Sequence, residues 1–187
     1  AALLPLGFWL PHAYTAATPA VAALFAVMTK VGVYAILRIT TIAFVPGNTT
    51  ADILAPWLVP LALATVAIGR FGMLAARSFS QILATFVLVS TGLLLTAIGL
   101  GGIVFYLPHT ITVTAALFLL AGYIAARRGA VEDRLERDTQ VRNLGLIGLA
   151  YLMLALSVTG LPPLAGFLGK VMLLNGSPGT AAGYANW

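Results

Sequence analysis

The sequence predicts an all-α protein, a polytopic transmembrane helix bundle in which one helix is discontinuous. Hydrophobic residues make up 60% of the 187 residues, and the mean hydropathy is +1.01. Charged residues make up 8%, whereas a soluble domain carries about 25%. The apolar segments have about 20 residues or more, enough to cross a hydrocarbon core of about 30 Å. These observations exclude the soluble enzyme classes.

Five spanning segments are predicted along a single membrane domain, at 19–43, 53–76, 79–99, 103–126 and 143–175. Pro19 suits the first turn of a helix. The last segment is interrupted at 160–166 by two consecutive prolines, which cannot continue a helix. Residues 1–18 are interpreted as the end of an earlier helix and an interfacial connection. Its Trp9, His12 and Tyr14 are expected at the level of the lipid headgroups.

The arginines predict the orientation in the membrane. One set of segment ends and the charged loop 127–142 hold Arg70, Arg77, Arg127, Arg128, Arg134, Arg137 and Arg142, whereas the opposite loops hold only Asp52. The positive-inside rule therefore places 127–142 and 1–18 in the cytoplasm and 44–52 outside. The loop pairs opposite charges four residues apart, at Arg128–Glu132, Asp133–Arg137 and Arg134–Asp138. It is interpreted as a solvated surface helix, or alternatively as a docking surface for a partner subunit.

Several function classes are excluded by missing residue types. The chain has no cysteine, so it contains no disulfide, iron–sulfur or thiol chemistry. The ten basic residues are dispersed, which argues against nucleic-acid binding. No phosphate loop, metal-ligand cluster or catalytic triad is present, so we expect no catalytic residue, metal or cofactor. Because the chain starts at Ala1 without a signal peptide, we expect a fragment of a longer membrane protein.

Lys30 is the first of three ionisable residues predicted inside the membrane. It lies 11 residues after Pro19, which is about 17 Å along the helix and close to the midplane. A charge at that depth is costly and is kept mostly for function. We interpret Lys30 as a proton-carrying site, with hydrogen bonds from Thr29 and Tyr34. The alternative is a lysine paired only for packing.

His109 follows Pro108, where we expect the helix to kink because proline lacks a backbone donor. Thr112 and the pair Thr110 and Thr114 add hydroxyls to a polar patch around the histidine. Histidine titrates near neutral pH and can relay protons. The alternative is a histidine that only joins helices by a hydrogen bond.

Lys170 follows the sequence GLPPLAG, with Pro162 and Pro163 at its centre. The helix that ends there leaves free carbonyls and a partial negative charge, which can stabilise an ammonium or a cation. Broken helices at membrane depth line protein or a wet cavity. The alternative is a simple turn with Lys170 at the membrane surface.

Three stretches, in order, resemble one family. They are PLGFWLPHAYTAATPAVAALFAVMTKVGVYAILR, HTITVTAALFLLAGYIA and GLPPLAGFLGK. They are similar to motifs of the antiporter-like proton-translocating membrane subunits. This family includes the Mrp/Pha-type cation/proton antiporter subunits, the D subunit above all, and the related L, M and N subunits of respiratory complex I. Gly7, Ser80, Gln81 and Thr114 depart from the complex I pattern, which favours the D subunit.

The resemblance implies a subunit of fourteen helices, of which this chain is about the middle third. It also implies a chain of ionisable groups along the membrane midplane. Lys30 matches the lysine of the eighth helix, His109 the central histidine and Lys170 the lysine of the broken twelfth helix. A glutamate and a further lysine of this axis are expected upstream of Ala1.

The functional hypothesis is a proton-translocating subunit of a Na⁺ or K⁺/proton antiporter. Its expected partners are other subunits of a hetero-oligomeric complex, protons, Na⁺ or K⁺ and the lipid bilayer, in the inner (plasma) membrane of a bacterium. One alternative is a proton-pumping subunit of an NADH–quinone oxidoreductase. Another is a structural subunit without transport, in which Lys30 and Lys170 would have ion-pair partners.

Overall fold

The computed structural model describes Leu3 and residues 6–43, 51–96, 103–128, 135 and 144–175. Within these residues the regular elements are helices: η1 (Leu6–Phe8), α1 (Trp9–Ala16), α2 (Pro19–Ala43), α3 (Ala51–Ala75), α4 (Phe79–Thr96), α5 (Ile103–Arg128), α6 (Leu144–Thr159) and α7 (Ala165–Asn175). Helices α2 to α5 are each long and apolar enough to cross a membrane. Helices α6 and α7 are shorter and follow one another across a break, so the predicted fold class is confirmed.

The helix bounds follow the predicted segments with local differences. Helix α2 covers the predicted range 19–43, and α3 begins two residues before the predicted 53. Helix α5 extends to Arg128, into the predicted loop. Most of the charged loop lies outside the described residues, including both members of the pairs Asp133–Arg137 and Arg134–Asp138 and the Glu132 of the third pair. Leu135 is described, and its amide donates to the carbonyl of Arg77 at 3.1 Å.

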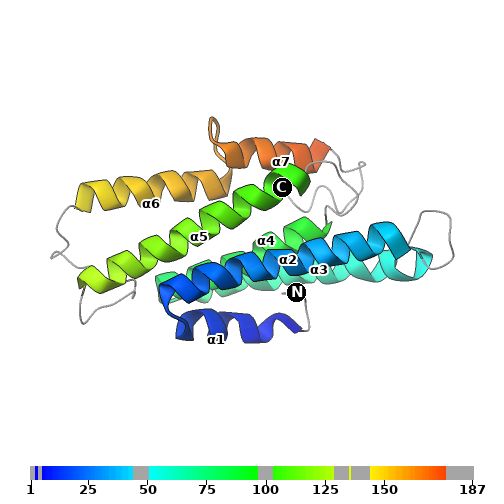
Figure 1. The fold of residues 1–187 in the computed structure, drawn as a ribbon, viewed down its shortest axis with the longest axis horizontal. Helices are drawn as coiled ribbons and strands as arrows, with labels where there is room; N and C mark the ends of the chain where they lie inside the picture. The colour runs from blue at the N-terminus through cyan, green and yellow to red at the C-terminus, as the bar shows by residue number, and fades with distance from the viewer. Residues whose placement is uncertain are drawn as a thin grey trace.

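Helix α5 joins two groups of helices (Figure 1). Helices α2, α3 and α4 run along the long axis of the molecule, and α6 and α7 lie on the other side of α5. The contacts agree, because α5 touches α2 and α4 as well as α6 and α7. Lys30 on α2 and Lys170 on α7 therefore belong to groups that α5 connects.

Helix α1 covers part of the range predicted as a helix end and an interfacial connection. It is helical from Trp9 to Ala16 and packs along α4. Trp9 and His12 are exposed, but Tyr14 is 1% exposed and its ring lies 5.2 Å from the ring of Phe118 on α5. Helix α1 therefore turns Tyr14 into the bundle, whereas Trp9 and His12 face outward.

Small residues bring the helices close together. Helices α3 and α4 pack through Gly92, where an added Cβ would stand 2.6 Å from Cγ2 of Val66 and 2.8 Å from the carbonyl oxygen of Ala62. Glycine at a contact lets two backbones approach, which is how membrane helices gain packing energy without a hydrophobic driving force. Helix α4 also contacts α2, where Lys30 lies.

Candidate functional site: two lysines and a broken helix

Lys30 lies in the middle of α2 and is 0% exposed. Its Nζ lies 2.5 Å from Oγ of Ser90, 3.1 Å from Oγ1 of Thr91 and 3.4 Å from the carbonyl oxygen of Val87. All three partners belong to α4 and all are neutral. They offer three acceptors, which is the number that the three N–H groups of an ammonium require.

The two hydroxyls can serve either protonation state of Lys30. In the structure Ser90 and Thr91 both donate to the carbonyl oxygen of Val87, which leaves their lone pairs free for the ammonium. A hydroxyl rotates to suit its partner and can donate to a neutral amine instead. The site can therefore hold a proton on Lys30 and also release it without leaving a polar group unpaired.

The residues expected to bond Lys30 do not do so. The hydroxyl of Thr29 lies 2.9 Å from the carbonyl oxygen of Ala26 and 3.4 Å from the hydroxyl of Tyr14, and Tyr34 is 52% exposed. Neighbours on a helix point about 100° apart, so Thr29 faces α1 where Lys30 faces α4. The signal that was missed is the adjacent pair Ser90 and Thr91 inside an apolar segment.

None of the side chains that the structure describes is acidic. The sequence has five Asp and Glu residues, and the side chains of all five lie outside the described part. The observed partners of Lys30 and Lys170 are hydroxyls and carbonyls. The structural-subunit hypothesis expects ion pairs at these lysines, so the observed contacts do not favour it.

Removing the hydroxyl of Ser90 measures how much the hydrogen bond between Lys30 and α4 contributes to stability. We expect Ser90→Ala to destabilise the full-length subunit by about 1–3 kcal/mol, because a buried donor of Lys30 loses its acceptor. In a Lys30→Met background the same change should cost little. Thermal unfolding of the four proteins of this cycle measures the coupling. Equal costs in both backgrounds would contradict the assigned contact.

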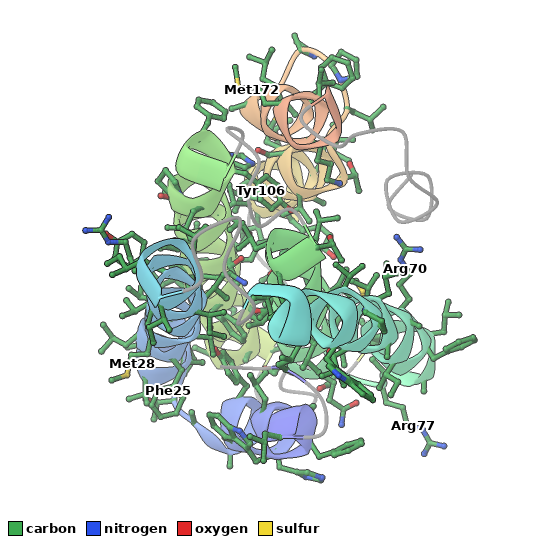
Figure 2. The ribbon with its side chains drawn as sticks, turned by 90° about the vertical axis from the view of Figure 1, so that its right-hand side faces the viewer. Phe25, Met28, Arg70, Arg77, Tyr106 and Met172 are labelled. Carbon is green, nitrogen blue, oxygen red and sulfur yellow. The ribbon has the colours of Figure 1, made fainter. Side chains whose placement is uncertain are left out.

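His109 lies on α5 and contacts the end of α6. Its Nε2 is 3.5 Å from Oγ of Ser157, and its ring centroid lies 6.5 Å from that of Tyr106, which is buried in the interior of the bundle (Figure 2). Helix α5 continues through Pro108, where a kink was expected. Because Pro108 has no N–H, one carbonyl of the preceding turn lacks its helical donor. Neighbouring helices can supply a hydrogen bond to such a carbonyl.

The polar patch predicted around His109 is divided over two faces of α5. Thr112 is exposed and donates to the carbonyl oxygen of Pro108 at 2.9 Å. Thr114 is buried and donates to the carbonyl oxygen of Thr110 at 2.6 Å. The hydroxyl of Thr110 is buried without a hydrogen-bond partner. Thr110 and Thr114 therefore face the core, whereas Thr112 does not.

Lys170 lies on α7 and reaches back to the end of α6. Its Nζ donates to the carbonyl oxygen of Thr159 at 2.8 Å, across the break that begins at Gly160, where φ is +78°. Gly166 packs so closely that an added Cβ would stand 1.7 Å from the carbonyl oxygen of Ser157 and 3.0 Å from Nε2 of His109. The break thus brings His109 and Lys170 together around the end of α6, and Lys30 lies on the other side of α5.

Arg70 is a charged neighbour that sequence reasoning treated only as a surface anchor. Figure 2 shows Arg70 extending from α3 on the side of α6 and α7, whereas Arg77 points away from them. Arg70 bears a permanent positive charge on that side of α3. The charged side chains described on the side of the break, Lys170 and Arg70, are thus both positive.

The comparisons with known proteins identify the family. Residues 1–183 match the family described as "NADH:quinone oxidoreductase/Mrp antiporter, TM". The chain belongs to this family. The resemblance inferred from the three motifs is therefore confirmed.

Members of this family similar to the chain include two bacterial proteins. The chain is 37% identical over 201 residues to the D subunit of a probable K⁺/H⁺ antiporter of Rhizobium meliloti. It is 34% identical over 181 residues to the D subunit of a Na⁺/H⁺ antiporter of Bacillus subtilis. These matches cover 94% and 93% of the chain but 37% and 36% of the relatives. The chain thus spans little more than a third of their length.

Two solved structures share the arrangement of helices. A chain of the Mrp complex from Dietzia sp. matches with a TM-score of 0.85 and 32% identity, over 99% of this chain and 36% of that one. A chain of the membrane-bound sulfane sulfur reductase, an archaeal respiratory membrane complex, matches with a TM-score of 0.81. At 20% identity the second match shows the fold alone.

Proposed function

We propose that the chain is part of a proton-translocating subunit of a monovalent cation/proton antiporter. The observation that carries the proposal is Lys30, an amine fully buried in the middle of a spanning helix and held by neutral groups only. Such a residue marks an ion or proton pathway, because burial without function would cost several kcal/mol. In the proposed mechanism Lys30 and Lys170 alternate between the protonated and the neutral state.

The lateral link between the two lysines runs through α5. Thr110 lies on the buried face of α5 between Tyr106, which packs in the cluster of Val33, and Val113, which packs in the cluster of Ala26. Lys30 lies between Val33 and Ala26 on α2. The unpaired hydroxyl of Thr110 suits a bridging water, since buried waters bind groups that lack a protein partner. His109, one residue away, continues the path toward the break.

The wider setting follows from the relatives. Both of the similar proteins are bacterial and are named as parts of antiporters for K⁺ or Na⁺. We therefore place this chain in a multi-pass subunit of a hetero-oligomeric complex in the bacterial plasma membrane, with the arginine-rich ends of the helices in the cytoplasm. The exchanged ion is Na⁺ or K⁺.

The test uses the full-length parent subunit with its natural partners in everted vesicles. A pH gradient is established, and Na⁺ or K⁺ is then added. We expect the added cation to dissipate the gradient, and the more effective ion identifies the substrate. If neither ion changes the pH gradient but NADH oxidation builds one, the result would favour a redox-driven pump. No response to either treatment would favour a structural subunit.

A further inference from the structure

The two prolines of the break remove specific hydrogen bonds from the end of α6. In an α-helix the carbonyl of residue i accepts from the N–H of residue i+4. Pro162 and Pro163 have no N–H, so the carbonyls of Val158 and Thr159 have no helical donor. Just before the prolines, the amide of Gly160 keeps its helical bond to the carbonyl of Leu156, and the amide of Leu161 donates to that same carbonyl rather than to the carbonyl of Ser157.

An ammonium already occupies this carbonyl end. Nζ of Lys170 lies 2.8 Å from the carbonyl oxygen of Thr159. The end of a helix carries about half a negative elementary charge, which stabilises a cation. Thr159 is exposed and Lys170 only partly buried, so the contact is not sealed inside the bundle. The ammonium of Lys170 thus occupies a position where the helix end would also stabilise a free cation.

Among the side chains that the structure describes around the break, none is acidic. Helix α5 contributes His109 and Tyr106, and α3 contributes the positive charge of Arg70. On α6 the only ionisable residue is Tyr151, and on α7 it is Lys170 itself. Without an acidic group among the described side chains, an ammonium and a second cation would repel each other in a medium of low dielectric constant.

We propose that the carbonyl end of α6, at Val158 and Thr159, is a binding site for Na⁺ or K⁺ from which the ion and the side chain of Lys170 exclude each other. Backbone carbonyls at the ends of broken membrane helices are suitable ligands for alkali cations. The inference rests on the proposed antiport, for which it names the site of the transported ion. The ion binds when the amine moves off the carbonyl of Thr159, which connects the ion to the same residue that carries the proton.

The test measures Na⁺ and K⁺ binding to the purified full-length complex by isothermal titration calorimetry. In Lys170→Met the competing ammonium is gone, and we expect ion binding at least about tenfold tighter than in the wild type, within the usual range of coupling between two ligands. Lys170→Arg keeps a permanent cation in place, and we expect it to abolish binding at this site. Other sites in the complex contribute equally to all three proteins.

A second variant tests the carbonyls themselves. Changing Pro162 and Pro163 to alanine restores two N–H donors, which can pair with Val158 and Thr159. We expect this variant to bind the ion at least about tenfold more weakly than the wild type. Gly148→Ala is the matched control, since an added Cβ there meets nothing within 4 Å, and it should bind like the wild type.

The failure of this inference differs from the failure of the proposed function. Equal ion binding in the wild type, Lys170→Met, Lys170→Arg and the alanine variant would overturn the site, whatever the vesicle assay shows. Tighter binding in Lys170→Met, with no cation-driven proton movement in wild-type vesicles, would support the site and reject antiport.

Discussion

Replacing Lys30 by methionine is expected to abolish cation-driven proton movement while leaving the complex assembled. Methionine is close in length to lysine and is the substitution that a packed core tolerates best. It removes the amine that contacts Ser90, Thr91 and Val87 and that can take up and release a proton. The measurement is the rate at which added Na⁺ or K⁺ dissipates a pH gradient in everted vesicles, with equal amounts of complex. We expect a loss of at least about a hundredfold, as when a positioned proton carrier is removed.

Lys30→Gln separates proton carriage from hydrogen bonding. Its amide can still donate to Ser90 and Thr91 but does not take up a proton near neutral pH. We expect glutamine to be as inactive as methionine. If glutamine restored the wild-type rate, Lys30 would serve only to join α2 to α4, and its proton-carrying role would be wrong.

Gly166→Ala is expected to inactivate the protein by separating the two halves of the broken helix. The added Cβ would stand 1.7 Å from the carbonyl oxygen of Ser157, a backbone atom that cannot move without α6. Helix α7 must then shift, and Lys170 moves away from Thr159 while His109 loses its close approach to α7. We expect a near-complete loss of transport, together with a stability loss of about 1–3 kcal/mol typical of overpacking.

The control for Gly166→Ala is Gly148→Ala on α6, where an added methyl group has open space. Vesicle transport and the midpoint of thermal unfolding are measured for both variants. The control should match the wild type in both measurements. If Gly166→Ala transported like the wild type, α7 could move without loss of transport. That result would contradict a role in transport for the contact between Lys170 and the end of α6.

Local sequence patterns were sufficient to predict where the chain is helical and where a helix breaks. Long apolar segments predicted α2 to α5, since a helix satisfies its own backbone hydrogen bonds within a bilayer. Pro162 and Pro163 predicted the break, because two missing donors and two fixed φ angles are properties of the local chain. The three motifs were sufficient to indicate the family. The positions of Lys30, His109 and Lys170 along their helices also follow from counting residues.

The face that each helix turns inward is set by the packing of the helices against one another. The spanning helices are apolar on all sides, so their sequences contain little information about the buried face. For this reason Ser90 and Thr91, rather than Thr29 and Tyr34, are the partners of Lys30. For the same reason Tyr14 is buried in the bundle.

The same limit applies at the broken helix. The chain predicts free carbonyls near Pro162 and Pro163, but Lys170 reaches Thr159 only because Gly166 lets α7 pack against Ser157. Arg70 extends from α3 on the side of α6 and α7, although it is distant from the break in the sequence. Local chemistry sets the helices and their breaks, whereas the partners of each ionisable group depend on contacts between helices that no local pattern specifies.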